Sequence, residues 1–464
     1  ALPIYSVMKM LEKLFKLKEK NTTVWTEIMA GITTFMAMSY IIFVNPSILS
    51  KSGMDYYSVY GATILASVLG TLIMGLYANV PYAVSCGLGL NALFTYTICG
   101  SLGFTWQEAL VMVFICGIIN LLVTVTSIRK KVIKAMPVFM QEAITVGIGL
   151  FITYIGIKNA GIIEFSVSSV NNGIANAADV IPGLAIFREP AVILACIGLI
   201  ITTILVSKKV KGAYLIGIIA TTLIGIPMGV TKLPDFSNYS IMPSIEPTFL
   251  KFDFSGLLTA KAGIVCVIMT IFALVISDLF DTIGTFIGTG KKSGIFEMKE
   301  NGEIPQNMER AMVVDSIATV IGSLLGTSNL GTFVESSAGI GVGGRTGLTA
   351  VVVAILFGLS LFLSPIVACV PMAAISPVLI LIGVSMMSGV GKIDWNDILV
   401  AIPAFFIIVM MPLSYSITTG IQFGFIFYML VNLVNKKGKD VSPMIYIFSI
   451  LFIIDFIYKA CQVT

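Results

Sequence analysis

The sequence predicts an all-α, polytopic membrane protein with fourteen transmembrane segments, arranged as two inverted repeats of seven. Two observations lead to this fold class. The chain of 464 residues is 57% hydrophobic and only 11% charged, whereas soluble domains carry about 25% charged residues. In addition, apolar stretches of membrane-spanning length recur along the chain, and positive charges concentrate in alternate loops between them.

The predicted segments form two sets separated by a polar loop at residues 231–261. Before the first set, residues 8–21 form a basic amphipathic stretch, which we expect to lie on the cytoplasmic membrane surface. A last apolar stretch, residues 443–458, holds Asp455 and either spans the membrane or lies in its interface. We expect the fourteen segments at residues 28–46, 57–78, 82–99, 108–127, 138–157, 190–207 and 213–230, and at 262–288, 308–326, 328–341, 346–364, 368–389, 395–412 and 414–435.

The loop charges predict the orientation of the chain. With a cytoplasmic N-terminus, most of the 28 Lys and Arg residues fall in cytoplasmic loops, as the positive-inside rule requires. These include the clusters at Arg129–Lys131, Lys208–Lys211, Lys291–Lys299 and Lys436–Lys439. An odd number of segments in each half gives the halves opposite orientations. The sequence therefore predicts a multi-pass protein of the inner cell membrane.

Two of the segments are interrupted by glycine and carry a polar side chain. Glu335 lies in the middle of the glycine-rich tenth segment, and Asn91 lies in the third segment at Ser85–Ala92. A carboxylate at membrane depth is normally paired, protonated or exposed to a water-filled cavity. Broken segments with polar groups near the midplane mark the binding sites of transporters. The alternative is that the Glu335 stretch is an ordinary loop of Gly and Ser residues.

The eighth segment contains two acidic residues on one helix face. Asp278 and Asp281 are three residues apart, and two such carboxylates in an apolar environment should not both remain ionised. One of them would suit a group that takes up and releases a proton. Thr34 and Asp278 are separated in sequence by the same number of residues as Asn91 and Glu335, so Thr34 is the repeat counterpart of Asp278. We therefore expect Asp278 to contact a ligand and Asp281 to support it. Alternatively, this stretch lies in a loop, or both side chains cap helix ends.

Several other residues near these positions are candidates for ligand contact. Asn91 offers a donor and an acceptor for the edge of a heteroaromatic ring, although it could equally form a hydrogen bond between helices. Phe35, Phe94 and Phe333 could stack on a planar ligand, or face lipid or the core. Ser336, with Ser337, could offer its hydroxyl or the backbone N–H groups of a half-helix.

Composition and motifs exclude several classes of function. The chain has no histidine, which excludes a His-ligated metal site and a nucleophile–histidine pair. It has no P-loop sequence, so no ATPase is expected. Most of the 7 cysteines lie inside apolar runs and are expected to be buried. We therefore expect no enzyme, cofactor, metal or nucleic-acid partner.

Four motifs resemble the AzgA-like adenine/guanine/hypoxanthine permeases of the nucleobase/ascorbate transporter superfamily. The resemblance covers nearly the whole chain. The family usually has proline and methionine where this chain has Cys86 and Leu88. This difference bears on the strand-to-helix break and on which purine is preferred. The motifs are Glu27–Phe35 within Thr22–Asn45, Gly87–Ala92, Ser277–Gly284 and Thr332–Thr349.

The resemblance implies a fold like that of the uracil permease, with short strands in the third and tenth segments. It implies a core domain at residues 28–134 and 262–366 and a gate domain at 135–261 and 367–435. Residues 1–27 and 436–464 are then terminal segments.

The resemblance also implies proton-coupled import of purine bases by alternating access. The family's substrate and proton sites fall on Asn91, Asp278, Asp281 and Glu335, and Thr34, Ser336 and Phe94 complete the expected binding site. The partners would be a purine base, protons and membrane lipids, and a homodimer is left open. The alternatives are an anion transporter or channel of the same fold, which three site acids disfavour, and a membrane enzyme or receptor.

Overall fold

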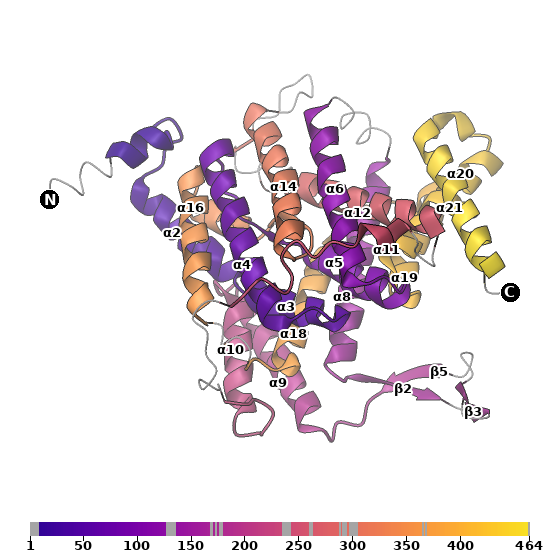
Figure 1. Ribbon diagram of the computed structural model, residues 1–464, viewed down its shortest axis with the longest axis horizontal. Coiled ribbons are helices and arrows are strands. Elements are labelled where there is room, and N and C mark those ends of the chain that lie inside the picture. Colours follow the sequence, from indigo (N-terminus) through magenta and orange to yellow (C-terminus); the bar gives the residue numbers. More distant parts are fainter. Residues whose placement is uncertain are drawn as a thin grey trace.

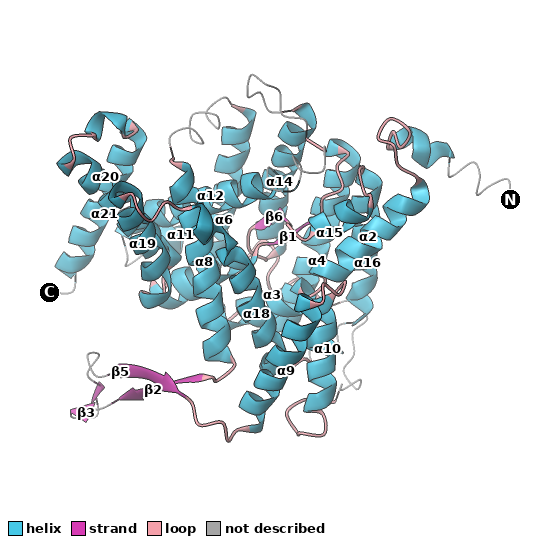
Figure 2. Cartoon of the chain, turned by 180° about the vertical axis from the view of Figure 1, so that it is seen from behind, coloured by secondary structure: helices cyan, strands magenta, loops and turns pink. Residues whose placement is uncertain are grey.

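The computed structural model describes residues 9–126, 136–167, 170–171, 174–175, 180–233, 243–258, 263–286, 289, 295–296, 305–363, 366 and 369–462. Most of them are helical, and the strands are short (Figures 1 and 2). The predicted cytoplasmic charges at Arg129–Lys131 and at Lys291, Lys292 and Lys299 lie outside the described residues.

Helices of the first half lie over the predicted apolar segments. Thr23, Asp55 and Thr105 start three of them, because each side chain accepts a hydrogen bond from a backbone N–H of the first turn. The first segment was predicted as one span, but Ser39 and Tyr40 divide it into two helices. The elements are α2 (Val24–Met38), α3 (Ile41–Leu49), α4 (Tyr56–Ile73), β1 (Val84–Cys86), α5 (Leu88–Ala92), the π-helical stretch η3 (Leu93–Ser101), α6 (Trp106–Val125), α8 (Val138–Asn159), α9 (Pro190–Ser207) and α10 (Ala213–Gly225).

The second half begins after a short helix, α11 (Phe254–Leu258), and also contains a short strand followed by a short helix. Its last helix, α21, covers the apolar stretch at 443–458 and packs on α20 and α12, with Phe448 stacked on Phe272 at 3.7 Å between ring centres. The elements are α12 (Gly263–Thr285), α14 (Gln306–Leu325), β6 (Leu330–Thr332), α15 (Ser336–Val342), α16 (Gly347–Ser360), α18 (Met372–Met386), the 3-10 stretch η7 (Met387–Lys392), α19 (Ile398–Leu413), α20 (Ile417–Val434) and α21 (Pro443–Gln462).

The two short strands implied by the family resemblance are present and pair with each other. β1 and β6 run antiparallel, with Val84 opposite Thr332 and Cys86 opposite Leu330. All six strand residues are buried. The pairing satisfies backbone N–H and C=O groups that would otherwise be unpaired inside the molecule. It also brings the starts of α5 and α15 into one region.

Two groups of helices surround these strands (Figure 2). In one group, α14 packs on α4 and α6, and α16 packs on α2 and α4. In the other, α8 packs on α18 and α19, and α9 packs on α10 and α18. A hairpin between α8 and α9, not predicted from the sequence, extends away from the helices (Figure 2). Its strands are β2 (Ile163–Val167), β3 (Val170–Asn171), β4 (Ile174–Ala175) and β5 (Val180–Leu184).

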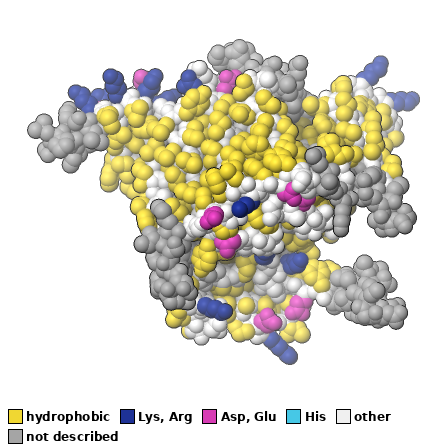
Figure 3. All heavy atoms as spheres, viewed as in Figure 1, with side chains coloured by type: hydrophobic (Ala, Val, Ile, Leu, Met, Phe, Trp, Pro, Cys, Tyr) yellow, Lys and Arg dark blue, Asp and Glu magenta, His cyan; other side chains and the backbone are white. Residues whose placement is uncertain are grey.

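The surface has the character of a membrane protein. Hydrophobic side chains form a broad band across one face, and Lys and Arg residues gather mainly at its margins (Figure 3). Seven helical stretches among the described residues are long and apolar enough to cross a membrane, and shorter apolar helices accompany them. The N-terminal stretch differs in part from expectation: Phe15 and Leu17 are buried against Val24 and Leu348, whereas Leu14 is exposed.

Candidate functional site

A cavity of about 110 Å³ lies where the connections after β1 and β6 meet α12, α8 and α18. Its walls carry two carboxylates, Asp281 from α12 and Glu335 from the connection between β6 and α15. No Lys or Arg is among the described residues that line it. The other walls combine apolar side chains with a few hydroxyl groups, an arrangement typical of small-molecule sites. They include Leu90, Ile148, Phe333, Ile382 and Met386, and the hydroxyls of Tyr40, Ser277, Thr285 and Ser385.

Glu335 is held by a tyrosine from a distant part of the chain. It occupies the N-cap position of α15, and its Oε1 atom accepts a 2.5 Å hydrogen bond from the Tyr40 hydroxyl. Tyr40 lies at the break between α2 and α3 and is almost completely buried. Its ring packs edge-to-face against Tyr214 of α10 and beside Phe333. Glu335 therefore has a fixed neighbour on one oxygen.

Asp281 faces two glycines, Gly87 after β1 and Gly331 within β6. A Cβ atom added to Gly87 would lie 4.0 Å from Oδ2 of Asp281, and one added to Gly331 would lie 3.9 Å from it. Because neither glycine has a side chain, the backbone of both segments lines the cavity beside this carboxylate. This is a close-approach role that a larger residue would compromise.

A third acid, Asp315 of α14, supports the site from behind. Its Oδ2 accepts from the Thr282 hydroxyl at 2.6 Å, and its Oδ1 accepts from the Thr332 hydroxyl at 2.7 Å. Thr282 follows Asp281 on α12, and Thr332 ends β6. Asp315 therefore ties the helix that carries one cavity carboxylate to the strand that precedes the other.

Asp278 and Asn91, which we expected to contact a ligand, are not among the residues that line this cavity. Asp278 is buried and accepts a 2.6 Å hydrogen bond from Asn120 of α6, so on α12 it is Asp281 that reaches the cavity. Asn91 is buried too, and its Oδ1 accepts from the Ser328 hydroxyl. In this structure both residues connect packed elements.

Three other predicted site residues also lie outside the cavity. Thr34 is buried in α2 where it packs against Gly339 of α15. The Ser336 hydroxyl accepts from the backbone N–H of Ala83 at 3.1 Å, which fastens α15 to the start of β1. Phe94 is fully buried in the hydrophobic core. Thr34 and Ser336 therefore help to position α15 and the start of β1.

Sequence reasoning missed two polar residues of the site. Asp315 had a signal, because it lies inside the predicted segment 308–326 and intramembrane acids are rare. Tyr40 had none, because a tyrosine in an apolar stretch is ordinary and only the fold brings it to Glu335. Of the stacking candidates, Phe333 lines the cavity, whereas Phe35 packs on Phe357 at 5.3 Å between ring centres.

The far end of α15 is anchored by a buried carboxylate. Glu27 of α2 accepts from the backbone N–H of Arg345 at 2.8 Å and from the Thr349 hydroxyl at 2.6 Å. The Arg345 side chain in turn donates to the carbonyls of Ile340 and Gly344, at 2.7 Å each. Because carbonyls at a helix end lack intrahelical partners, this arrangement caps α15 and fixes it relative to α16.

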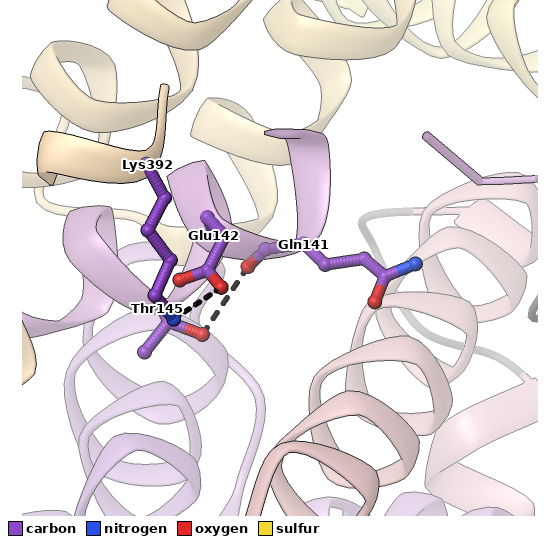
Figure 4. A network of polar contacts seen from close by, with 4 residues as sticks. All are labelled: Gln141, Glu142, Thr145 and Lys392. Atoms are coloured by element: carbon purple, nitrogen blue, oxygen red, sulfur yellow. Dashed lines mark hydrogen bonds and ion pairs between the residues drawn. The ribbon is translucent and has the colours of Figure 1, made fainter. Parts of the chain in front are cut away.

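On the opposite side of the cavity, an ion pair joins α8 to η7, the 3-10 stretch that follows α18. Lys392 of η7 donates to Glu142 of α8 at 2.7 Å, and the Thr145 hydroxyl donates to the backbone carbonyl of Gln141 (Figure 4). Ile148 of α8 and Met386 of α18, which line the cavity, lie close in the chain to this contact. The pair is partly exposed, so it is expected to contribute less than about 1 kcal/mol to stability.

Matches to known transport proteins, rather than the cavity itself, indicate a transporter and not an enzyme. The chain belongs to the Permease family, whose model matches residues 26–423. This confirms the resemblance drawn from the sequence motifs.

Individual relatives are similar over nearly the full length. The chain is 40% identical to the adenine permease AdeP of Escherichia coli (strain K12), over 97% of this chain and 96% of that protein. It is 38% identical to the guanine/hypoxanthine permease PbuO of Bacillus subtilis (strain 168), over 95% of this chain and 99% of that protein. Its fold resembles the transmembrane domain of a cyanobacterium bicarbonate transporter, BicA, with a TM-score of 0.62 at 15% identity, covering 85% and 97% of the two chains.

Proposed function

We propose that this chain is a proton-coupled symporter that imports purine bases across the inner cell membrane. The observation that carries the proposal is the pair of carboxylates, Asp281 and Glu335, on the walls of one cavity. Full-length relatives named as adenine and guanine/hypoxanthine permeases support the substrate class.

Purine bases present ring N–H and amino donors, and carboxylates accept such hydrogen bonds well. Asp281 and Glu335 accept hydrogen bonds from these donors, and Phe333 packs against the face of the purine ring. Asp278, held by Asn120, and Asp315, held by two threonines, position the binding groups. Asn91 and Ser336 fix the strand connections in the same way.

The same carboxylates explain proton coupling. No cation lines the described part of the cavity, so two ionised carboxylates there repel each other. A proton bound by either Asp281 or Glu335 removes this repulsion and leaves the other to accept from the purine. Loading the carrier then requires both a proton and a base.

Alternating access follows from a movement between two domains with the predicted boundaries. The cavity has walls from β1–α5, β6–α15 and α12 on one side, and from α8 and α18 on the other. The packing pattern supports fourteen segments in two inverted repeats: α14 packs on α6 as α4 packs on α16, and α18 packs on α9 as α8 packs on α19. The N-terminus is cytoplasmic in this topology.

An anion transporter of the same fold is the alternative. The likeness to a bicarbonate transporter is consistent with it as to fold. Anion sites, however, use Arg, Lys or helix N-termini without opposing carboxylates. The two acidic walls of this cavity therefore favour the purine.

Uptake into proteoliposomes tests the proposal. Labelled hypoxanthine, guanine, adenine and uracil are offered with an imposed pH gradient and with the gradient collapsed. We expect at least one purine to accumulate only while the gradient lasts. If no base accumulates under proton or sodium gradients, the substrate class is wrong, and bicarbonate and other anions are tested in the same vesicles.

A pair of variants tests the coupling role. Glu335→Gln removes one of the two carboxylates from the cavity, whereas Glu246→Gln removes an exposed acid outside it. We expect Glu335→Gln to lose accumulation against a gradient and Glu246→Gln to retain it. A Glu335→Gln protein that still accumulates purine would rule out Glu335 as the coupling group.

A further inference from the structure

We propose that Tyr40 is a specificity-determining residue, which reads the second of two adjacent N–H donors on an oxo-purine. The inference rests on the proposed function and adds the residue and the chemical feature that it recognises. Tyr40 lines the cavity beside Glu335, although it lies in a part of the chain distant from Glu335 in sequence.

The hydrogen-bond direction determines what Tyr40 offers to a ligand. Its hydroxyl donates to Oε1 of Glu335 at 2.5 Å, so its only donor is occupied. A phenol oxygen that donates can still accept a hydrogen bond, and an ionised carboxylate only accepts. Tyr40 and Glu335 therefore present two neighbouring acceptors to the cavity, from two different segments of the chain.

Packing keeps the tyrosine in this orientation. The ring of Tyr40 is 5.5 Å from that of Tyr214 in an edge-to-face contact, and 6.5 Å from that of Phe333. One turn earlier on α2, Met36 lies against Gly212, which has a positive φ of 72° at the start of α10. Tyr40 is thus enclosed by both α10 and the β6–α15 connection, and its hydroxyl is a fixed feature of the wall.

Two adjacent acceptors match a purine edge with two adjacent donors. Guanine has such an edge, because its ring N1–H lies next to the 2-amino group. Hypoxanthine has the N1–H without the amino group, and adenine has no N–H at N1. We therefore expect Tyr40 to favour guanine over hypoxanthine through one additional hydrogen bond.

The test compares Tyr40→Phe with the unchanged protein in purified, detergent-solubilised form. The variant keeps the ring and its contacts but loses the hydroxyl. Dissociation constants for labelled guanine and hypoxanthine are measured for both proteins. One net hydrogen bond corresponds to about a fivefold change in affinity, so the guanine-to-hypoxanthine affinity ratio is expected to fall about fivefold.

Tyr60→Phe is the matched control. Its hydroxyl is buried and donates to the backbone carbonyl of Ser360, away from the cavity, so this variant should leave the ratio unchanged. An equal loss for both purines in Tyr40→Phe would mean that Tyr40 merely supports Glu335, and would overturn the inference. An unchanged ratio would overturn it too.

The unchanged protein separates this inference from the proposed function. If it binds adenine but neither oxo-purine, the role of Tyr40 is wrong while purine transport stands. If it binds no purine at all, the proposed function fails, and the inference fails with it.

Discussion

The β1–α5 and β6–α15 segments have the same succession of strand and short helix, yet they contribute differently to the cavity. In the first, the single residue Gly87 joins strand to helix, and Asn91 lies within the helix, bonded to Ser328. In the second, three residues join them, and the last is Glu335, which faces the cavity. A longer connection thus places a carboxylate at the helix start, where the shorter one has only backbone.

The difference teaches that similar architecture does not imply similar chemistry. Asn91 and Glu335 were expected to occupy equivalent places, but one lies inside a helix and the other at an N-cap. The backbone of both segments lines the cavity, through Gly87 and Gly331. We infer that the two segments share the role of shaping the site, while only the second supplies a charged group.

The largest effect is expected from the acid that faces both segments. Asp281→Asn should weaken purine binding about 100-fold, because it removes a charged acceptor from the cavity wall. Asp278→Asn should weaken it at least tenfold less, since Asp278 bonds Asn120 instead. Binding of labelled purine to purified protein measures both. Equal losses would show that Asp278 also contacts the ligand.

A smaller loss, about tenfold, is expected when either segment gains a methyl group. In Gly87→Ala and Gly331→Ala the new Cβ would meet Asp281 at ordinary contact distance, so folding should survive while the space for a ligand shrinks. Purine affinity and the thermal midpoint are measured together. Gly347→Ala is the contrast, because its Cβ would clash with the backbone of Gly75 and should reduce folding itself. If the two cavity variants bind normally, the segments do not shape the site equally.

Asn91→Ala should affect stability more than binding. It leaves the buried Ser328 hydroxyl without its acceptor, at a cost of about 1–3 kcal/mol, or a few degrees in thermal midpoint. Purine affinity of the folded protein should stay within about twofold. Thermal denaturation and ligand binding on the same sample distinguish the two effects. A selective loss of binding would restore Asn91 as a direct ligand contact.

The smallest effect is expected at the ion pair between α8 and η7. Lys392→Gln removes a partly exposed pair and should change the free energy of unfolding by less than about 1 kcal/mol. Lys439→Gln, a change of charge that leaves this pair intact, is the control. Uptake rates of the two variants should agree. A specific loss of transport in Lys392→Gln would indicate that the pair stabilises one conformation of the carrier.

Much of the fold was predictable because apolar length is a strong signal in membrane proteins. Breaks within such stretches were less so. Hydrophobic residues lie on both sides of Ser39 and Tyr40, and the spacing of these hydrophobic residues does not indicate that α2 ends there. The hairpin at β2–β5 was missed for a related reason, since its short strands give too weak a periodic pattern.

The site was predictable only where charge made it conspicuous. Glu335 and Asp281, which line the candidate cavity, were singled out because acids are costly in an apolar segment. The packing of α12 against α6 and β6 decides whether Asp278 or Asp281 faces the cavity. This packing cannot be inferred from the pattern of residues in one sequence. The partnership of Tyr40 with Glu335 likewise depends on tertiary packing alone.

The anchor at Glu27 has a consequence for how this protein is made. Glu27 belongs to α2, near the start of the chain, but its partner Thr349 is 322 residues further on. The chain is synthesised from its N-terminus, so this carboxylate has no partner until α16 has been made. By then α8, α9 and α10, which belong to the other group of helices, have already been synthesised. Until then Glu27 is either solvated or protonated, so the packing of α2 on α16 forms only after residue 349 has been made.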